Sequence, residues 1–332
     1  MNTTLSTTLN VTLGGPAKIG LIGTITMDRI VHESGPTYDG IGGVLYQASV
    51  LAGLGEEVFL FGRCGEDLRP EVVRLAADWP SVRMGGVGFV PQPANLVNLF
   101  YPQAGERLET LDWAVPPADP GPVVAGIGSW DALLFVLNSG FDMTLDGWRT
   151  ILAAASCPAW LDIHSLVLEP SIGRPRRPRP VPDWPGWVRG VAWIQANLRE
   201  LACLCGHPER PPTDRETLEF AGRAFELGVR AAFVTLGPGG AMVLTPGRQE
   251  KAVAGSVGPI VDATGCGDVF AAAALTRLVR GASPSEAASF ATALASKAAL
   301  VTGVSATWKL AAARRPGPCP DQENPSSNRE GK

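Results

Sequence analysis

A short segment near the C-terminus combines two glycines with an aspartate, in the order Gly265-Cys266-Gly267-Asp268. The Ala-rich run that follows predicts a helix from about 266 to 280. Free backbone N–H groups at a helix N-terminus bind anions such as phosphate, and glycine removes the Cβ atoms that would keep a phosphoryl group away. Asp268 would lie in the first turn, where a carboxylate can take a proton from an attacking hydroxyl group. The joint pattern predicts phosphoryl transfer to an alcohol, although Asp268 alone is also typical of a carboxylate that favours the helix dipole.

Other polar residues follow segments that the sequence predicts as strands. Asp28 comes after an apolar run at 18–23, and ligands of open α/β sheets bind beyond the carboxyl ends of strands. Asn197 and Glu200 are three residues apart, so at a helix start they would share a face and could hold a hydrated Mg²⁺. The alternatives are a turn aspartate and a simple helix-cap pair.

The elements that must position these residues alternate along the chain. Continuous apolar runs separated by helices predict a mostly parallel sheet covered on both faces. The predicted strands are 18–23, 58–62, 132–137, 159–163, 191–196 and 231–236, and the predicted helices are 44–54, 145–155, 213–227, 266–280 and 283–301. Thr213 with Glu216 and Ser283 with Glu286 predict capping boxes at two of the helix starts, and Gly303 is the predicted stop of the last helix.

Two stretches break this rhythm. Residues 82–114 alternate and contain prolines, which predicts short antiparallel strands that form a lid together with residues near 24–40. Residues 173–189 are rich in Arg and Pro, which fits either a phosphate- or partner-binding loop or, as we favour, a solvated extended loop. The polar ends, 1–15 and 314–332, are expected to be disordered tails.

The segment Asp262-Ala263-Thr264-Gly265-Cys266-Gly267-Asp268-Val269-Phe270 resembles the signature D-T-x-G-A-G-D-x-F of the PfkB, or ribokinase-like, family of carbohydrate kinases. Further similar motifs follow in the family's order over roughly residues 18–305. The resemblance implies an α/β, ribokinase-like fold over residues 16–310: a central, mostly parallel sheet flanked by helices, with a small β-sheet lid. It also implies ATP-dependent phosphorylation of an alcohol, with Mg²⁺ and with K⁺ in some relatives.

The resemblance assigns site residues by position. It implies catalysis by Asp268 with Gly265, Cys266 and Gly267; substrate binding by Asp28, Gly42, Gly43, Gln47 and Asn95; ATP binding by Asn197, Thr235, Gly237, Gly240, Thr264 and Thr292; Mg²⁺ binding through water by Asn197 and Glu200; and a monovalent cation at Asp262. Gln47 stands where sugar kinases often have Asn, and Cys266 where Ala is common. A thiol at a helix N-terminus could also have a lowered pKa. His164, a lone His after a strand, receives no catalytic role.

Composition limits the function classes. The formal net charge of −4 weighs against nucleic acid as the main partner, and no apolar run reaches the ~20 residues that span a bilayer. The six cysteines show no disulfide framework, so reduced thiols and a cytoplasmic location are expected. The cluster Cys203-x-Cys205-x-His207 lacks a second ligand pair and favours a thiol-rich helix end over a zinc site.

The sequence therefore predicts a kinase for a small-molecule substrate: a sugar, sugar acid, nucleoside or other small alcohol. The alternative is a non-catalytic sugar- or nucleotide-binding member of the same fold that acts through a partner. A dinucleotide-dependent oxidoreductase would need G-x-G-x-x-G after the first strand, which Gly20 and Gly23 do not supply. An exposed edge of the lid sheet could pair two subunits into a homodimer.

Overall fold

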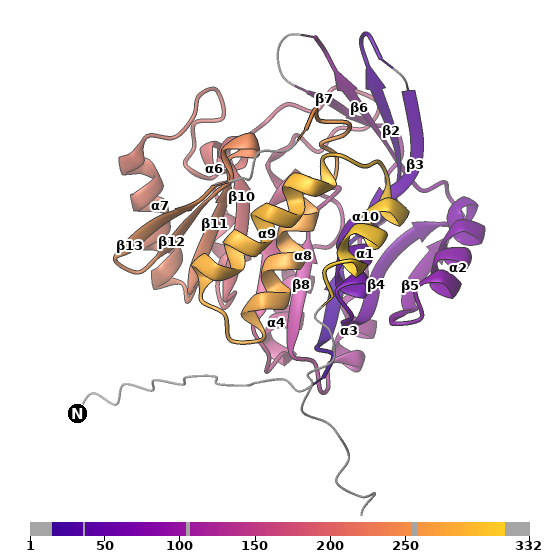
Figure 1. Ribbon diagram of the computed structural model, residues 1–332, viewed down its shortest axis with the longest axis horizontal. Coiled ribbons are helices and arrows are strands. Elements are labelled where there is room, and N and C mark those ends of the chain that lie inside the picture. The colour runs from indigo at the N-terminus through magenta and orange to yellow at the C-terminus, as the bar shows by residue number, and fades with distance from the viewer. Residues whose placement is uncertain (1–14, 36, 104–106, 254–257, 316–332) are drawn as a thin grey trace, which may run out of the picture.

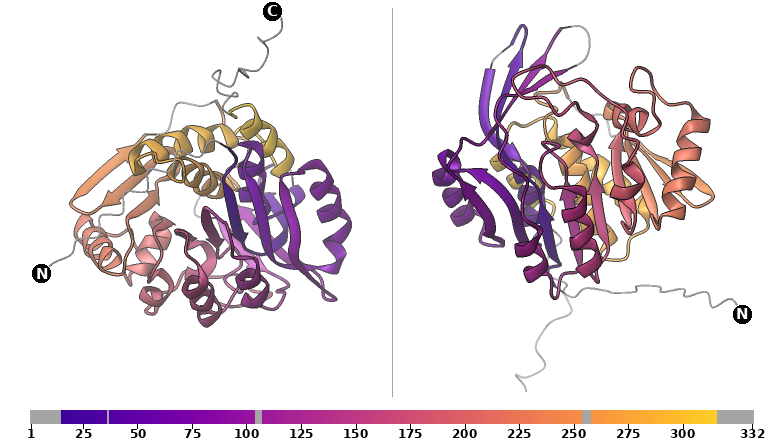
Figure 2. Two further views of the ribbon diagram at one scale, coloured as in Figure 1. Left: turned by 90° about the horizontal axis from the view of Figure 1, so that it is seen from below. Right: turned by 180° about the vertical axis from the view of Figure 1, so that it is seen from behind.

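The computed structural model describes residues 15–35, 37–103, 107–253 and 258–315. A large sheet lies between two layers of helices, and a smaller sheet stands over one end of it (Figures 1 and 2). Among the described residues the large sheet has nine strands in the order β13-β12-β11-β10-β9-β8-β1-β4-β5. All neighbours in it are parallel except β11–β12 and β12–β13, which form an antiparallel edge.

Most strands of the large sheet are apolar, as expected of a sheet buried on both faces, whereas the edge strand Arg248–Ala252 is polar and largely exposed. The strands are β1 (Lys18–Ile22), β4 (Glu57–Gly65), β5 (Val82–Val90), β8 (Ala132–Val136), β9 (Ala159–Asp162), β10 (Trp193–Asn197), β11 (Ala231–Thr235), β12 (Ala241–Thr245) and β13 (Arg248–Ala252). All six predicted strands are present, with ends that differ by a few residues.

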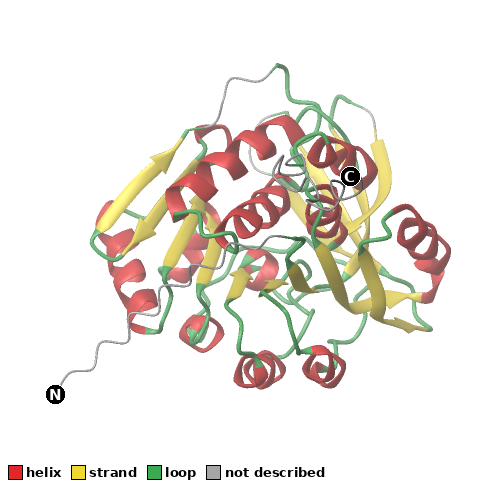
Figure 3. Cartoon of the chain, turned by 60° about the horizontal axis from the view of Figure 1, so that its bottom comes forward, coloured by secondary structure: helices red, strands yellow, loops and turns green. Residues whose placement is uncertain are grey.

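The helices divide between two hydrophobic cores, one on each face of the sheet (Figure 3). One core includes residues of α1 (Leu45–Gly53), α2 (Arg69–Asp78), α8 (Cys266–Leu278), α9 (Pro284–Ala298) and α10 (Val304–Ala312). The other includes residues of α3 (Pro120–Gly126), α4 (Leu145–Ala154), α5 (Trp184–Val188), α6 (Leu198–Leu204) and α7 (Asp214–Glu226). No helix among the described residues is both long and apolar enough to cross a membrane.

The smaller sheet has the order β3-β2-β6-β7. Its strands are β2 (Ile25–His32), β3 (Thr37–Gly43), β6 (Asn95–Tyr101) and β7 (Leu108–Leu111). Residues 82–90 were expected in this sheet, and that prediction is wrong, because β5 pairs in parallel with β4 at the edge of the large sheet. The alternation that suggested a lid strand belongs instead to a half-covered edge strand.

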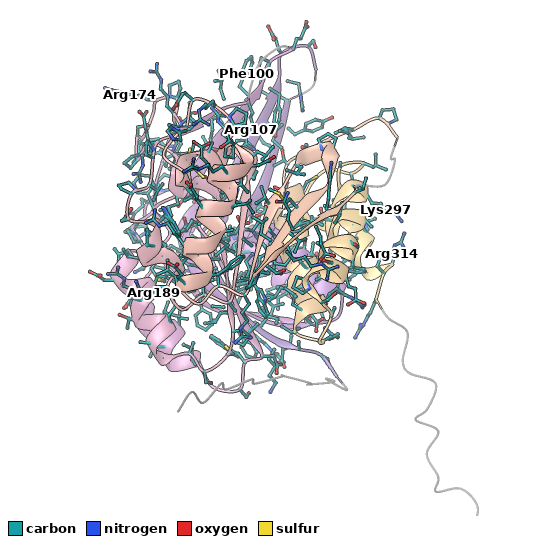
Figure 4. The ribbon with its side chains drawn as sticks, turned by 90° about the vertical axis from the view of Figure 1, so that its left-hand side faces the viewer. Phe100, Arg107, Arg174, Arg189, Lys297 and Arg314 are labelled. Atoms are coloured by element: carbon teal, nitrogen blue, oxygen red, sulfur yellow. The ribbon has the colours of Figure 1, made fainter. Side chains whose placement is uncertain are left out.

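The Arg- and Pro-rich stretch is not a solvated loop along its whole length. Its first part runs along β7: the N–H of Gly173 donates to Leu111 O at 2.8 Å and the N–H of Arg176 donates to Glu109 O at 2.9 Å. Arg176 is buried and forms an ion pair with Glu109 at 3.0 Å, whereas Arg174 is exposed at the rim of the molecule (Figure 4). The expectation of a solvated loop is therefore wrong at Arg176.

The starts of two later helices agree with the sequence predictions, and the end of the last predicted helix does not. α7 and α9 begin with the predicted capping boxes, formed by Thr213 with Glu216 and by Ser283 with Glu286. The predicted stop at Gly303 is instead the N-cap of a further helix, α10, which carries the fold beyond residue 310. The predicted tails fall almost wholly outside the described residues.

Candidate active site

One cavity lies between the small sheet and the start of α8. Its lining consists of Thr26, Asp28, Gly43, Tyr46, Val97, Leu99, Arg107, Glu109, Asn138, His164, Thr264, Gly265 and Asp268. Of the residues predicted to do chemistry, the structure thus brings Asp28, Gly43, Thr264, Gly265 and Asp268 together. They come from strands of the small sheet, the loop before α8 and the first turn of that helix.

The start of α8 fixes the position of Asp268. Gly265 is the N-cap residue and has φ 79°, a conformation that favours glycine. A Cβ atom there would lie 2.5 Å from the ring of Tyr46, whereas a Cβ on Gly267 would meet only Gln195 Nε2, at 3.6 Å. Gly265 is therefore required by the backbone and by packing, while Gly267 mainly leaves the helix start open.

Asp268 is buried, with 8% of its surface exposed. Burial raises the pKa of its carboxyl group to about 7, the charge of Asp28 raises it further, and a hydrogen bond from Gln47 opposes both effects. Nε2 of Gln47 donates that bond to Asp268 Oδ1. Gln47 does not line the cavity, so its predicted contact with the substrate is replaced here by support of the carboxylate. The reason is that its amide is held between α1 and the first turn of α8, by the hydrogen bond to Asp268.

Asp28 faces the same cavity from β2. Thr26 Oγ1 donates a hydrogen bond of 2.6 Å to Asp28 Oδ1, and burial raises the pKa of this carboxyl group to about 6. A Cβ on Gly42, in the paired strand β3, would lie 1.9 Å from Asp28 Oδ2. The space that Gly42 leaves is therefore filled by the carboxylate itself.

Asn138, to which the sequence assigned no role, lines the cavity, and Asn95, which was predicted to bind the substrate, does not. Asn95 is fully buried, its Oδ1 accepts from the N–H of Val115 at 2.7 Å, and it does not line the cavity. Asn138 does line it, and its amide exchanges two hydrogen bonds with the backbone of Thr24, at 3.0 and 2.9 Å. The signal that could have found Asn138 is its place just after β8, at the carboxyl end of a strand.

Asn197 and Glu200 form the capping box of α6, the alternative that the sequence left open. Asn197 Oδ1 accepts from the N–H of Glu200 at 2.9 Å, and Glu200 Oε2 accepts from the N–H of Asn197 at 2.8 Å. Burial raises the pKa of Glu200 to about 7. In the described part of the chain, no group of three His, Cys, Asp or Glu side chains is placed to hold a metal ion.

The residues predicted to bind ATP or a monovalent cation lie around the start of α8 and the end of β11. Thr235 ends β11, and Gly237 and Gly240 follow it with φ of 56° and 90°; they do not line the cavity. Thr292 is buried in α9, and no partner for its Oγ1 lies among the described residues.

Asp262 precedes the glycine segment and is buried. Its Oδ1 accepts from the N–H of Thr264 at 2.8 Å, and the described residues offer no partner to Oδ2. Cys266 packs against α9, where its thiol contacts Ala295 O at 3.6 Å. Burial raises the pKa of this thiol to about 12, so the lowered pKa suggested by the helix N-terminus is wrong.

Comparison with known proteins supports the resemblance seen in the sequence. The model of the pfkB family carbohydrate kinases matches residues 170–310. Ribokinase of Arabidopsis thaliana is 34% identical to this chain over 113 residues. That alignment covers 33% of this chain and 29% of the length of the relative. The resemblance to the PfkB family is thereby confirmed.

Solved structures of ribokinase-like proteins share the architecture. The structure of Arabidopsis thaliana ribokinase complexed with ribose and ATP matches with a TM-score of 0.65 and 21% identity, over 90% of this chain and 99% of that one. Adenosine kinase from Sinorhizobium meliloti matches with a TM-score of 0.65 and 19% identity, over 85% and 93%. The fold is therefore ribokinase-like, as the sequence predicted.

The fit of Asp28 against β3 gives a first testable prediction. Gly42→Ala places a methyl group on the Asp28 carboxylate, so we expect it to lower the free energy of unfolding by about 1–3 kcal/mol. Gly40→Ala in the same strand is the matched control, because a Cβ there meets nothing within 4 Å. Urea denaturation of both variants measures the difference. Equal stability of the two would contradict the described packing of Asp28.

Proposed function

We propose that this chain is an ATP-dependent kinase that phosphorylates a hydroxyl group of a sugar or sugar-like small molecule. The observation that carries the proposal is the position of Asp268, a buried carboxylate in the first turn of α8 that shares one cavity with Asp28. The match to the pfkB carbohydrate kinases includes this segment. The similarity to a ribokinase complexed with ribose and ATP supports ATP as the donor.

The acceptor binds between the two carboxylates. Asp28 accepts hydrogen bonds from acceptor hydroxyls, and the adjacent Gly43 and Asn138 complete that side of the cavity. The reacting hydroxyl faces Asp268, which takes its proton as the oxygen attacks the terminal phosphorus of the donor. A base with a pKa of about 7 is largely ionised just above neutral pH and still basic enough to accept the proton.

The helix start stabilises the phosphoryl group in transfer. α8 has 13 residues, and the backbone N–H groups at its N-terminus carry a partial positive charge. This charge stabilises an anion bound there. The N–H of Cys266 already donates to Ala263 O at 3.3 Å, so Gly265 and Gly267 are the main donors of the segment. Arg107 lines the same cavity and adds a full positive charge.

The oxygens of Asn197 and Glu200 fit Mg²⁺, which is bound in proteins through one or two carboxylates, substrate phosphates and retained waters. When bound, Mg²⁺ neutralises charge on the donor phosphates. Asp262 Oδ2, buried and without a partner among the described residues, fits a monovalent cation such as K⁺. Thr235, Gly237, Gly240, Thr264 and Thr292 are proposed to bind the rest of ATP.

The similar proteins include a ribokinase and an adenosine kinase. Both sugars and nucleosides are therefore candidate acceptors. The non-catalytic alternative is less favoured, because a protein that only binds needs no buried base beside a helix start.

A homodimer through the lid stays a prediction. One edge of the small sheet, β7, is already covered by residues 173–176, which leaves β3 as the edge for pairing. A cytoplasmic location also stays a prediction.

Replacement of the proposed base tests the function. Asp268→Asn keeps the size of the side chain and removes the proton acceptor, so we expect kcat to fall by about 10²–10⁴. The measurement is ADP release from Mg-ATP with a panel of sugars, sugar acids and nucleosides. A variant that retains full turnover would contradict the role of Asp268. Binding of ATP and sugar with no turnover by either form would favour the non-catalytic alternative.

The pH dependence provides a second test. Asp268 must be ionised to accept a proton, and its pKa is about 7, so kcat/KM should rise with pH up to about 7 and level off above it. Gln47→Leu removes the hydrogen bond that lowers this pKa, so the acid limb should move to higher pH. A limb that stays in place in Gln47→Leu would show that another group controls it.

A further inference from the structure

One polar side chain lies among the apolar residues of β10. Gln195 follows Trp193 and Ile194 in that strand, and only 3% of its surface is exposed. Burial of an amide is unfavourable unless hydrogen bonds replace those that it makes with water. Nε2 of Gln195 makes two such bonds, but its Oε1 has no partner among the described residues. A buried amide that is only partly satisfied indicates a role beyond packing.

The shorter of the two bonds joins the large sheet to the start of α8. Nε2 of Gln195 donates to Gly267 O at 2.9 Å. A carbonyl oxygen has two lone pairs, so Gly267 O can accept this bond in addition to one within the helix. Gly267 has no Cβ, and the backbone of glycine is less restricted than that of other residues. The bond from Gln195 therefore restrains a segment that glycine would otherwise leave freer to move.

This restraint reaches Asp268 through one peptide group. Gly267 O and the N–H of Asp268 belong to the same planar trans peptide, so a bond that fixes the direction of one also fixes the direction of the other. That N–H donates to the carboxylate of Asp268 itself. Two hydrogen bonds thus orient the carboxylate, one from Gln47 and one from the peptide group that Gln195 holds.

Asp162 holds the amide of Gln195 from the neighbouring strand. It is the register partner of Gln195 in β9, and its Oδ2 accepts from Nε2 at 3.3 Å. Burial raises the pKa of the Asp162 carboxyl group well above its ordinary value, and the charges of Glu200 and Asp268 raise it further. A neutral Asp162 therefore holds Gln195 without adding a negative charge near Asp268.

We propose that Gln195 is a positioning residue, which holds the peptide group between Gly267 and Asp268 so that the Asp268 carboxylate faces the reacting hydroxyl group. The inference rests on the proposed function, in which Asp268 is the base. Gln195 does not line the cavity that holds Asp268, so it acts through the peptide group and not by contact with a substrate.

Gln195→Met tests the inference, because methionine keeps the length of the side chain and removes the donor. We expect kcat for ADP release from Mg-ATP to fall roughly tenfold or more, since a small displacement of a catalytic group lowers the rate steeply. KM for ATP should change by less than about twofold, because the variant removes no contact with ATP. Ile194→Val is the matched control: it alters a buried side chain of the same strand on the opposite face of the sheet, and it should keep kcat.

Combination with Asp268→Asn separates positioning of the base from a general loss of structure. A residue that acts through Asp268 has little effect once the base is absent, so Gln195→Met should lower kcat by less than about threefold in the Asp268→Asn background. The same fold loss in both backgrounds, an unchanged kcat in Gln195→Met, or an equal loss in Ile194→Val would overturn the inference. Failure of the proposed base is visible separately, as full turnover in Asp268→Asn alone.

Nuclear magnetic resonance makes the test independent of turnover. In protein labelled with carbon-13 at the aspartate carboxyl groups, the signal that Asp268→Asn removes belongs to Asp268. It should shift in Gln195→Met and stay in place in Ile194→Val. An unshifted signal in Gln195→Met would overturn the inference. A shifted signal in a chain that forms no ADP from Mg-ATP with any compound would support the positioning of the carboxylate and contradict the kinase function.

Discussion

The burial of two carboxylates in one cavity is the constraint on which the rest of the site depends. Removal from water favours the protonated forms of both carboxyl groups, and their pKa values rise to about 6 for Asp28 and about 7 for Asp268, where the charge of Asp28 adds to the effect of burial. Hydrogen bonds from Thr26 and Gln47 offset part of this effect. A hydroxyl group bound between these carboxylates would give its proton to Asp268, whose pKa is close to neutral pH.

A cavity that holds both carboxylates requires the small sheet, the lid, to be held against the main body. Asp28 belongs to the small sheet and Asp268 to the main body, so the cavity exists only when the lid lies over the start of α8 (Figure 1). Tyr101 in β6 reaches Thr264 through their hydroxyl groups, 3.2 Å apart. On the opposite side the buried pair of Arg176 and Glu109 ties β7 to the segment that follows β9. These contacts hold the small sheet to the main body on two sides of the cavity.

Short sequence patterns predicted those elements of the fold that depend on interactions between residues close together in the chain. Apolar runs, capping boxes and the glycines before α8 predicted most strands and helices and the position of Asp268. The role of Gln47, the place of β5 and the burial of Arg176 depend on which segments pack together, and no local pattern contains that information. Asn138 and His164 follow strands β8 and β9, and the rule that ligands bind at carboxyl ends of strands could have indicated them.

The central claim is that the transferred phosphoryl group lies between the start of α8 and Asp268. A crystal structure with ADP, Mg²⁺ and aluminium fluoride, a mimic of the phosphoryl group in transfer, tests it most directly. The account predicts the fluoroaluminate within hydrogen-bond distance of the N–H groups of Gly265 and Gly267, with the Asp268 carboxylate facing it. A fluoroaluminate bound elsewhere, or an Asp268 carboxylate that faces away from it, would contradict the account.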